Sequence, residues 1–316
     1  MTEPADLARP EVLARVMGKV VGRRDEIETV LAALAASRHV VLEGPPGTGK
    51  STLVRSLAKA TGLTFLLVEG HAELTPARLI GHHDPSRVLN EGYTSETFVE
   101  GPLVRAVREG AILYIEELNR VPEETLNVLV TVMSEGELHV PRVGVFTATP
   151  GFALVAAMNP YDAVGTARIS SAISDRTCRV AMGYQVTAEE IEIVARQTGA
   201  KSGPWLDRVV ELVRRTRAHG DIRVGASVRG AIDLVLVANS LARLRDQDAM
   251  SLDITRPAAN AALSGRIRLQ ESSGKTAEKV LEDLINEVWG DSHEGESHVT
   301  LVEDRGGSPK VARFPI

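Results

Sequence analysis

Cysteine and long apolar runs are scarce in this sequence. Cys178 is the single cysteine among 316 residues, which excludes an intrachain disulfide and favours a reducing compartment. The chain has no run of about 18 apolar residues, and its first residues, MTEPADLARPEVL, lack the apolar core of a signal peptide. These absences predict a cytoplasmic protein without a membrane span.

The chain also lacks the excess of positive charge that dedicated nucleic-acid-binding proteins carry. Its formal net charge is -6, so nucleic acid is not an expected partner, although a local basic patch is compatible with this total. Charged residues make up 25% and apolar residues 43% of the chain, which is the composition of an ordinary globular protein. Its length suits one large domain or two.

Apolar periodicity divides the chain into two parts. After a polar leader, short apolar stretches alternate with helical patterns from Val20 to about Tyr184, which predicts a parallel α/β sheet. The remainder is helical in pattern, and Thr187 and Glu190 have the spacing of a capping box at its first helix. We expect a domain boundary near Gln185. The predicted domains are an α/β domain at 1–185, a smaller helical domain at 186–290, and a polar linker and tail of uncertain order at 291–316.

The segment GPPGTGKS, Gly44 to Ser51, fits the pattern G-x-x-x-x-G-K-[ST] at every required position. An apolar strand precedes it and a helical pattern follows it, as a phosphate-binding loop requires. Glycines let backbone N–H groups turn toward phosphates, Lys50 reaches the β- and γ-phosphates, and the Ser51 hydroxyl ligates Mg²⁺. The alternative is a Gly-Pro turn with a solvated lysine, which the flanking strand and helix disfavour.

Two adjacent carboxylates, Glu116 and Glu117, end the apolar stretch in ILYIEELNR. In proteins with a phosphate-binding loop, we expect a second strand beside the loop's strand, with an acid at its C-terminal end that holds the metal through water. Glu116 occupies that place, and Glu117 would activate the attacking water as a general base. Both lie where the strand ends, so both can face the nucleotide. A solvated strand terminus is the alternative.

These motifs and several downstream ones make the chain resemble the AAA+ ATPases, and within them the MoxR-like group related to chelatase AAA+ subunits. The similarity extends from Val20 to Gly230 and includes VGRRDEIETVLAALAASRHVVLEGPPGTGKS and ILYIEELNRVPEETLNVLVTVMSEGEL. LVAAMNP, SSAISDR and GASVRGAIDL resemble the family's sensor-1 strand, arginine-finger segment and sensor-2 helix. The resemblance implies a P-loop NTPase fold, with a parallel sheet sandwiched by helices and followed by a smaller all-α lid domain.

By position, the resemblance implies roles for three further side chains. Asn159 would be sensor 1, which helps to hold the attacking water. Arg176 would be the arginine finger that acts on a neighbouring subunit's nucleotide, with Arg168 as a competing candidate. Arg229 would be sensor 2, reaching from the lid to the γ-phosphate, with Arg223 as a weaker candidate. The predicted site comprises the catalytic residues Glu117, Asn159, Arg176 and Arg229, the metal ligands Ser51 and Glu116, and the nucleotide-binding residues Val21, Gly22, Gly44, Pro45, Pro46, Gly47, Thr48, Gly49, Lys50, Ser51 and Thr52.

The resemblance also implies structures for two irregular regions of the sequence. Residues from about 74 to 100 would form a helix-2 insert, and residues from about 137 to 157 a hairpin before sensor 1. Both would face whatever is remodelled, and each is also compatible with a long surface loop. Val20 to Gly22 would pack the adenine or begin a hydrophobic core. Asn119 and Arg120 would support the site or face a neighbouring subunit.

Three functions follow from these motifs. The resemblance implies a homo-oligomeric ring, expected to be a hexamer, that hydrolyses ATP with Mg²⁺ and remodels a protein partner; partners of relatives often bear a von Willebrand factor A domain. A P-loop switch of the GTPase type is disfavoured, because no Asn-Lys-x-Asp guanine-reading segment is present. A P-loop kinase is disfavoured, because the Glu-Glu pair with downstream Asn159, Arg176 and Arg229 is more than phosphoryl transfer to a small acceptor needs. A nucleotide-dependent assembly scaffold with weak hydrolysis is the third hypothesis, since Glu116 replaces the usual Asp and Mg²⁺ demands strict geometry.

Overall fold

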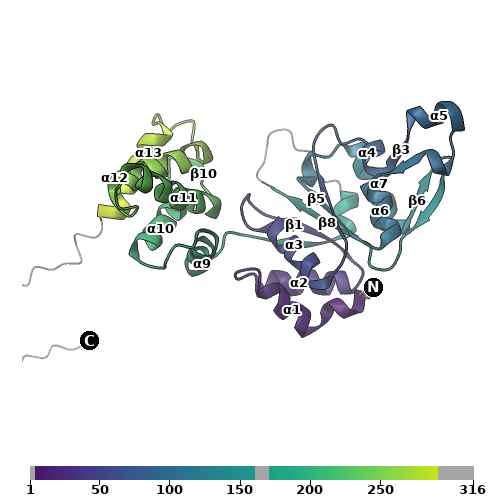
Figure 1. The fold of residues 1–316 in the computed structure, drawn as a ribbon, viewed down its shortest axis with the longest axis horizontal. Coiled ribbons are helices and arrows are strands. Elements are labelled where there is room, and N and C mark those ends of the chain that lie inside the picture. Colours follow the sequence, from purple (N-terminus) through teal and green to yellow (C-terminus); the bar gives the residue numbers. More distant parts are fainter. Residues whose placement is uncertain (1–3, 161–170, 291–316) are drawn as a thin grey trace, which may run out of the picture.

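Residues 4–160 and 171–290 are described by the computed structural model of this chain. They form an α/β part and a helical part, joined by one connecting segment (Figure 1). In these two ranges, every helix is too short or too polar to cross a membrane. The competing candidate Arg168 and the predicted tail at 291–316 lie outside the described residues.

A five-stranded parallel sheet lies at the centre of the α/β part. Across the sheet, the strands are β2 (Phe65–Glu69), β5 (Ile112–Glu116), β8 (Ala153–Met158), β1 (His39–Glu43) and β9 (Thr177–Ala181). Every neighbouring pair is parallel, which confirms the predicted parallel α/β sheet. Helices cover both faces, so the central strands are continuous apolar runs rather than alternating ones.

The strand that ends in the two acids does not lie beside the strand of the phosphate loop, so this expectation was wrong. β8 lies between β5 and β1 and pairs with both. Its first five residues, ALVAA, are all buried, and a strand that is apolar on both sides suits the interior of a parallel sheet. The strand that ends in the two acids is therefore separated from the strand of the phosphate loop by one intervening strand, β8.

The helices on the two faces pack against alternate residues of each strand. Val40 and Leu42 of β1 belong to the apolar cluster of one face, whereas Val41 belongs to the cluster of the other. This alternation follows from the two-residue period of a strand. The first face carries α1 (Pro10–Met17), α2 (Arg24–Ala35) and α3 (Lys50–Thr61), and the second carries α6 (Pro102–Glu109) and α7 (Glu123–Glu135).

The N-terminal segment is folded rather than a polar leader. It contains the 3-10 helix η1 (Pro4–Ala8) followed by α1. Val12 and Val16, one helical turn apart, are buried against the rest of the α/β part. Among residues 6–17, whose burial is described, Leu7, Val12 and Val16 are the buried ones, so the apolar stripe is too short to stand out from the polar residues around it.

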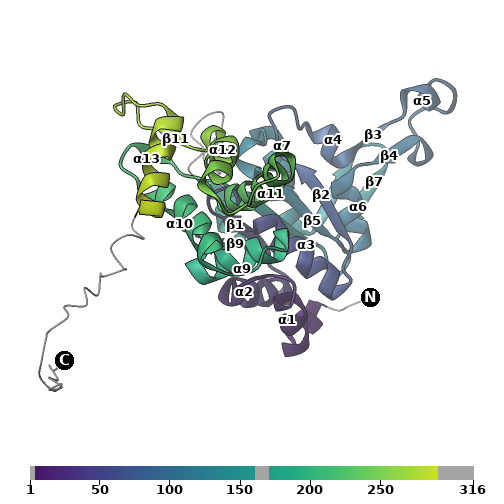
Figure 2. The same cartoon turned by 60° about the vertical axis from the view of Figure 1, so that its left-hand side comes forward.

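Two segments project from the sheet, away from the helical part (Figures 1 and 2). The predicted insert is more regular than its turn-rich sequence indicates, with α4 (Pro76–Ile80), β3 (Gly81–His83), α5 (Pro85–Glu91), η2 (Ser95–Thr97) and β4 (Phe98–Glu100). The hairpin comprises β6 (Glu137–Val140) and β7 (Gly144–Thr147). Its predicted end at 157 was wrong, because a turn at Gly151 (φ 102°) separates it from β8.

The helical part packs around its own apolar core. It comprises α9 (Thr187–Thr198), α10 (Pro204–Ala218), α11 (Val228–Arg245), α12 (Leu252–Leu263), η4 (Ser264–Arg266) and α13 (Ala277–Gly290), with a ribbon of β10 (Ile222–Val224) and β11 (Arg268–Leu269). The predicted helical lid is thus confirmed as a fold class. α12 was not anticipated, since Pro257 lies inside it and a proline usually argues against a helix interior.

Glu190 does not cap α9, so the capping-box expectation was wrong. Val186 is at the N-cap position, and no side-chain cap forms at this helix. Instead, the Glu190 side chain is 2% exposed and its carboxylate pairs with Arg217 at 2.7 Å and Arg214 at 3.2 Å. Arg217 also stacks on Tyr184, with its guanidinium carbon 3.9 Å from the ring centre. Two guanidinium partners in a buried setting outweigh one backbone cap.

Candidate active site

The segment GPPGTGKS joins the end of β1 to the start of α3. Gly47 and Gly49 have φ angles of 77° and 87°, a left-handed conformation that glycine adopts far more readily than other residues. At Gly44, an added Cβ would lie 2.0 Å from the carbonyl oxygen of Met182. The path of the loop therefore requires glycine at all three positions.

Lys50 lies at the centre of this loop. Its Nζ donates hydrogen bonds to the carbonyl oxygens of Gly44 and Pro45, both at 2.8 Å. The buried Thr48 hydroxyl donates to the same Pro45 carbonyl at 3.0 Å. The carbonyl groups of Gly44 and Pro45 are thus bonded to side chains of the loop itself.

The two acids occupy different backbone conformations. Glu116 is the last residue of β5, whereas Glu117 has a left-handed φ of 51° at the start of η3 (Leu118–Arg120). This turn lets both side chains line one pocket, although successive strand residues point to opposite sides. Glu117 Oε2 is buried, lies 3.4 Å from Arg120 Nε, and accepts no hydrogen bond from the described residues.

Tyr114 is a site residue that the sequence reasoning missed. Its hydroxyl donates a hydrogen bond to Ser51 Oγ at 3.2 Å, and the side chain is fully buried. Burial raises the pKa of Tyr114 far above its ordinary value, so the hydroxyl keeps its proton and remains a donor. The sequence could have indicated this role, because Tyr114 precedes Glu116 by two residues, and residues two apart on a strand point to the same side.

One pocket is lined by residues of the phosphate loop, by the two acids and by a residue of the helical part. Arg229, in the first turn of α11, lines the pocket and is its cation from the helical part. The contact between the two parts is close, since a Cβ on Gly47 would lie 2.3 Å from Ser227 Oγ. The lining residues are Pro46, Gly47, Gly49, Lys50, Ser51, Thr52, Tyr114, Glu116, Glu117, Ala157, Met158 and Arg229.

The charges of this pocket act on Lys50. Burial lowers the pKa of Lys50 to about 8, with smaller contributions from the positive charges of Arg229 and Arg23. The carboxylates of Glu117 and Glu116 act in the opposite direction and raise the pKa. The pocket wall therefore contains two cations, Lys50 and Arg229, and two anions, Glu116 and Glu117, and a phosphate added there would favour the protonated form of Lys50.

Asn159 and Asn119 lie at the edge of this pocket. Met158, the last residue of β8, lines the pocket, and Asn159 follows it directly. The Asn119 side-chain amide donates to the backbone carbonyl of Asn159 at 3.4 Å, so Asn119 supports the end of β8. Asn159 itself is outside the lining residues.

The remaining candidate arginines are outside the pocket lining. Arg176 follows α8 (Ser171–Asp175), donates from Nη1 to the Ala172 carbonyl at 3.0 Å and from Nε to the Ser134 hydroxyl. Arg223 is exposed on β10. Neither residue is among those that line the pocket.

Val21 and Gly22 lie at the connection between the two parts. The Gln185 side-chain amide donates to the Val21 carbonyl. Gly22 has a left-handed φ of 65°, and a Cβ there would lie 2.4 Å from the carboxyl group of Glu189. They line no part of the pocket around Lys50, but they border the start of the lid.

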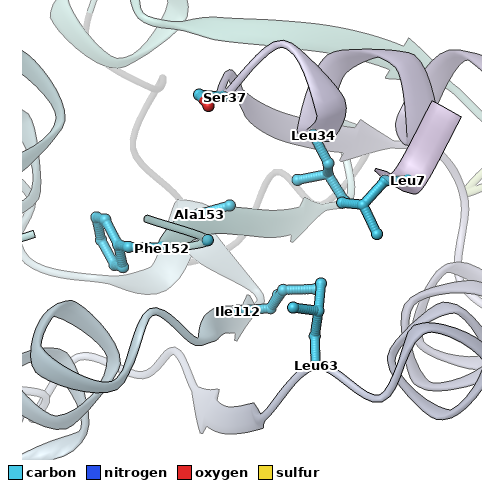
Figure 3. Close-up of a pocket in the computed structure, with 8 residues that line it drawn as sticks. Leu7, Leu34, Ser37, Leu63, Ile112, Phe152 and Ala153 are labelled. Atoms are coloured by element: carbon cyan, nitrogen blue, oxygen red, sulfur yellow. The ribbon is translucent and has the colours of Figure 1, made fainter. Parts of the chain in front are cut away.

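A second pocket lies near the opposite ends of the strands (Figure 3). Ile112 begins β5 and Ala153 begins β8, and both line it with Leu7, Leu34 and Leu63. Its other lining residues are Ser37, Gly151 and Phe152, so its wall carries no charge. These lining residues offer no cation to balance the charge of a phosphate.

The residues around Lys50 could hold a magnesium nucleotide. Space around Gly49 is open, since a Cβ there would have no heavy atom of the described residues within 4 Å. Ser51 and Glu116 offer the hydroxyl and carboxylate oxygens that Mg²⁺ prefers. The Glu117 carboxylate lines the same pocket, and Lys50 can balance phosphate charge.

Comparison with known proteins defines the class. The AAA domain (dynein-related subfamily) matches residues 39–177, and the AAA lid domain matches residues 214–284. The chain is 30% identical over 310 residues to YeaC of Bacillus subtilis, which covers 88% of this chain and 92% of YeaC. It is 34% identical over 226 residues to NorQ of Paracoccus denitrificans, covering 69% of this chain and 78% of NorQ. The chain belongs to the AAA+ ATPases.

Further comparisons agree with the AAA+ fold. The gas vesicle ATPase GvpN of Ancylobacter aquaticus is 26% identical over 275 residues, covering 81% of this chain and 74% of GvpN. A candidate ATPase from Cytophaga hutchinsonii shares the fold with a TM-score of 0.51 and 23% identity, covering 90% of this chain and 94% of that one. A RuvB structure from Thermotoga maritima has a TM-score of 0.54 at 18% identity, covering 93% and 88%. Such identities support the fold alone.

Proposed function

We propose that this chain is a Mg²⁺-dependent ATPase that works as a ring of identical subunits, a hexamer, and remodels or activates a protein partner. The observation that carries the proposal is the convergence of Lys50, Ser51, Glu116, Glu117 and Arg229 on one pocket. Membership of the AAA+ ATPases supports nucleotide-dependent activity. The cytoplasm is the proposed location.

Each residue of the pocket has a proposed task. Lys50 and the backbone N–H groups of the loop would bind the β- and γ-phosphates. Bound Mg²⁺ supplies neutralising charge at the phosphates, and Ser51 and Glu116 would hold it. Glu117, which lines the pocket and whose side chain is 40% exposed, would accept the proton of the attacking water through its carboxylate. Arg229 would bind the γ-phosphate from the lid.

Assembly would complete the site. Arg176 lies outside the pocket of its own subunit, which is compatible with action on the nucleotide of a neighbouring subunit. Such an arginine contributes about 10³–10⁵-fold to the rate in P-loop enzymes that use one. A monomer would therefore hydrolyse ATP very slowly, and turnover per subunit would rise as rings form.

The partner is proposed to be a protein. The insert and the hairpin project from the sheet and contact each other, since the Arg142 guanidinium carbon lies 4.5 Å from the centre of the Tyr93 ring. These projections offer a surface for a partner. A protein with a von Willebrand factor A domain is the partner class that the family resemblance supports.

The test measures ATP turnover against protein concentration, with particle mass followed by light scattering. Glu117→Gln should lower kcat by about 10²–10⁴-fold, the usual contribution of a general base. Glu123→Gln, at an exposed position of α7, is the matched control and should leave kcat unchanged. Arg176→Ala should abolish the dependence of turnover on assembly, whereas Arg105→Ala, at an exposed position of α6, should not.

Two results would contradict the proposal. The first is a turnover per subunit that stays constant while the mass changes from monomer to ring. The second is a Glu117→Gln variant with the kcat of the wild type. Either result would remove the residue roles on which the ring-ATPase mechanism depends.

A second candidate function is a scaffold that assembles with nucleotide but hydrolyses it weakly. The observation that favours it is Glu116, whose side chain is one methylene longer than that of the usual Asp. A longer ligand alters the position of the carboxylate relative to a metal with strict octahedral geometry. A stable ring with negligible turnover, also when a partner protein is added, would favour this function.

A further inference from the structure

Arg23 has an uncommon backbone conformation at the junction of the two parts. Gly22 and Arg23 are consecutive left-handed residues, with φ angles of 65° and 64°. Few residues other than glycine adopt this conformation, so the side-chain contacts of Arg23 have to compensate for it. The residue is only 9% exposed, which is rare for an arginine.

The guanidinium group of Arg23 connects three segments of the chain. Its Nη2 donates to the carbonyl oxygen of Thr48 in the phosphate loop at 3.1 Å and to the carbonyl oxygen of Gly183. Its Nη1 pairs with the Glu26 carboxylate at 2.7 Å. Its Nε is buried and has no hydrogen-bond partner among the described residues. Burying a charge is costly unless it is paired, so these directed contacts indicate a specific structural role for Arg23.

The bond to Thr48 determines the orientation of one group in the phosphate pocket. A peptide unit is planar and trans, so the Thr48 carbonyl and the Gly49 N–H point in opposite directions. Because Arg23 binds the carbonyl on the protein side, the Gly49 N–H is directed away from Arg23. Gly49 lines the pocket, and its left-handed φ of 87° leaves the peptide free to rotate once this bond is lost.

The bond to Gly183 extends the connection to the lid. Gly183 lies between the end of β9 and the start of α9, in the segment that joins the two parts. One nitrogen atom of Arg23 therefore touches both the phosphate loop and the base of the lid. A shift of either segment changes the geometry available to the other.

We propose that Arg23 is a positioning residue that holds the Gly49 N–H toward the nucleotide phosphates and ties the phosphate loop to the base of the lid. This inference rests on the proposed function, because it presumes that nucleotide binds in the pocket at Lys50. It adds a determinant of nucleotide affinity that touches no nucleotide atom itself.

The test measures the dissociation constant of fluorescent ADP by anisotropy, without Mg²⁺, for four forms of the full chain. Arg23→Ala should raise Kd by about tenfold, since hydrogen bonds from a charged donor contribute more than neutral ones. Arg23→Lys should raise it less, because an ammonium keeps the charge but lacks the planar fork. Arg24→Ala is the matched control: its side chain is 63% exposed and pairs with Glu28 at the surface of α2, so the wild-type Kd is expected.

Chemical rescue separates positioning from general stability. Millimolar methylguanidinium should restore most of the ADP affinity of Arg23→Ala and leave the wild type unchanged. In turnover assays, the Arg23 variants should raise KM for ATP more than they lower kcat. If Arg23→Ala does not fold, Arg23→Lys decides, since a Kd equal to that of the wild type would overturn the inference.

The outcomes distinguish this inference from the proposed function. If the wild type and Arg24→Ala bind no nucleotide, the proposed function fails. If both bind and folded Arg23→Ala binds equally well, only the role of Arg23 fails. Weaker binding by Arg23→Ala that methylguanidinium does not restore would also overturn it, because the loss would then be structural.

Discussion

The lowered pKa of Lys50 predicts a pH dependence of nucleotide binding. Burial is its main cause and Arg229 and Arg23 add to it, while Glu117 and Glu116 oppose it, with the result at about 8. Bound phosphate favours the charged ammonium and so raises this pKa. Above pH 8, binding must therefore take up a proton, and affinity must fall as the pH rises.

The expected magnitude follows from this pKa. Without nucleotide, a group with a pKa of about 8 is roughly nine-tenths protonated at pH 7 and roughly one-tenth protonated at pH 9. If only the charged form binds well, Kd for ADP should rise about tenfold between these pH values. Above pH 7 the phosphates of ADP stay ionised, so they contribute little to the change.

The assay is anisotropy of fluorescent ADP, titrated without Mg²⁺ at intervals from pH 7 to pH 9. Lys50→Arg is the control, because a guanidinium keeps its charge over this range and should give a flat profile even if its affinity is lower. Parallel profiles for the wild type and Lys50→Arg would refute the reasoning, since another group would then carry the pH dependence.

Three further predictions test the surroundings of the site. Glu190→Gln leaves buried guanidinium charge uncompensated, a loss of about 3 kcal/mol, and should lower Tm by several degrees, whereas exposed Glu192→Gln should not. Tyr114→Phe removes the bond to Ser51, worth about 1 kcal/mol, and should weaken Mg²⁺-dependent ADP binding severalfold in a Mg²⁺ titration, with exposed Tyr93→Phe as the control. Gly47→Ala combines a left-handed φ with a Cβ 2.3 Å from the lid, so ADP affinity should fall in the anisotropy assay.

The parts of the site that are local in sequence were predictable. The phosphate loop needs glycines, Lys50 and Ser51 within a few residues, because the backbone itself forms the cradle. Glu116 ends, and Glu117 follows, a strand that its apolar run makes evident. The positions of these residues in one pocket agree with that reading, while their roles remain predictions.

Long-range pairings were not predictable in the same way. The insertion of β8 between β5 and β1 depends on contacts between residues that are far apart in the sequence. Glu190 has the spacing of a capping box but is recruited by Arg214 and Arg217 from the next helix. In both cases tertiary packing overrides a local preference, and a single sequence contains no direct measure of packing.

Contacts between the lid and the loop limit how nucleotide can move the lid. A ligand shifts a conformational equilibrium only by its difference in affinity for the two states. Among the described lining residues, Arg229 is the one that comes from the helical part, whereas the loop and acids belong to the α/β part. ADP lacks the γ-phosphate that Arg229 would bind in the proposed mechanism. Any difference in lid position between the ATP-bound and ADP-bound forms must therefore arise mainly from Arg229. The contacts of Arg23 and Ser227 between the lid and the loop are available with either nucleotide.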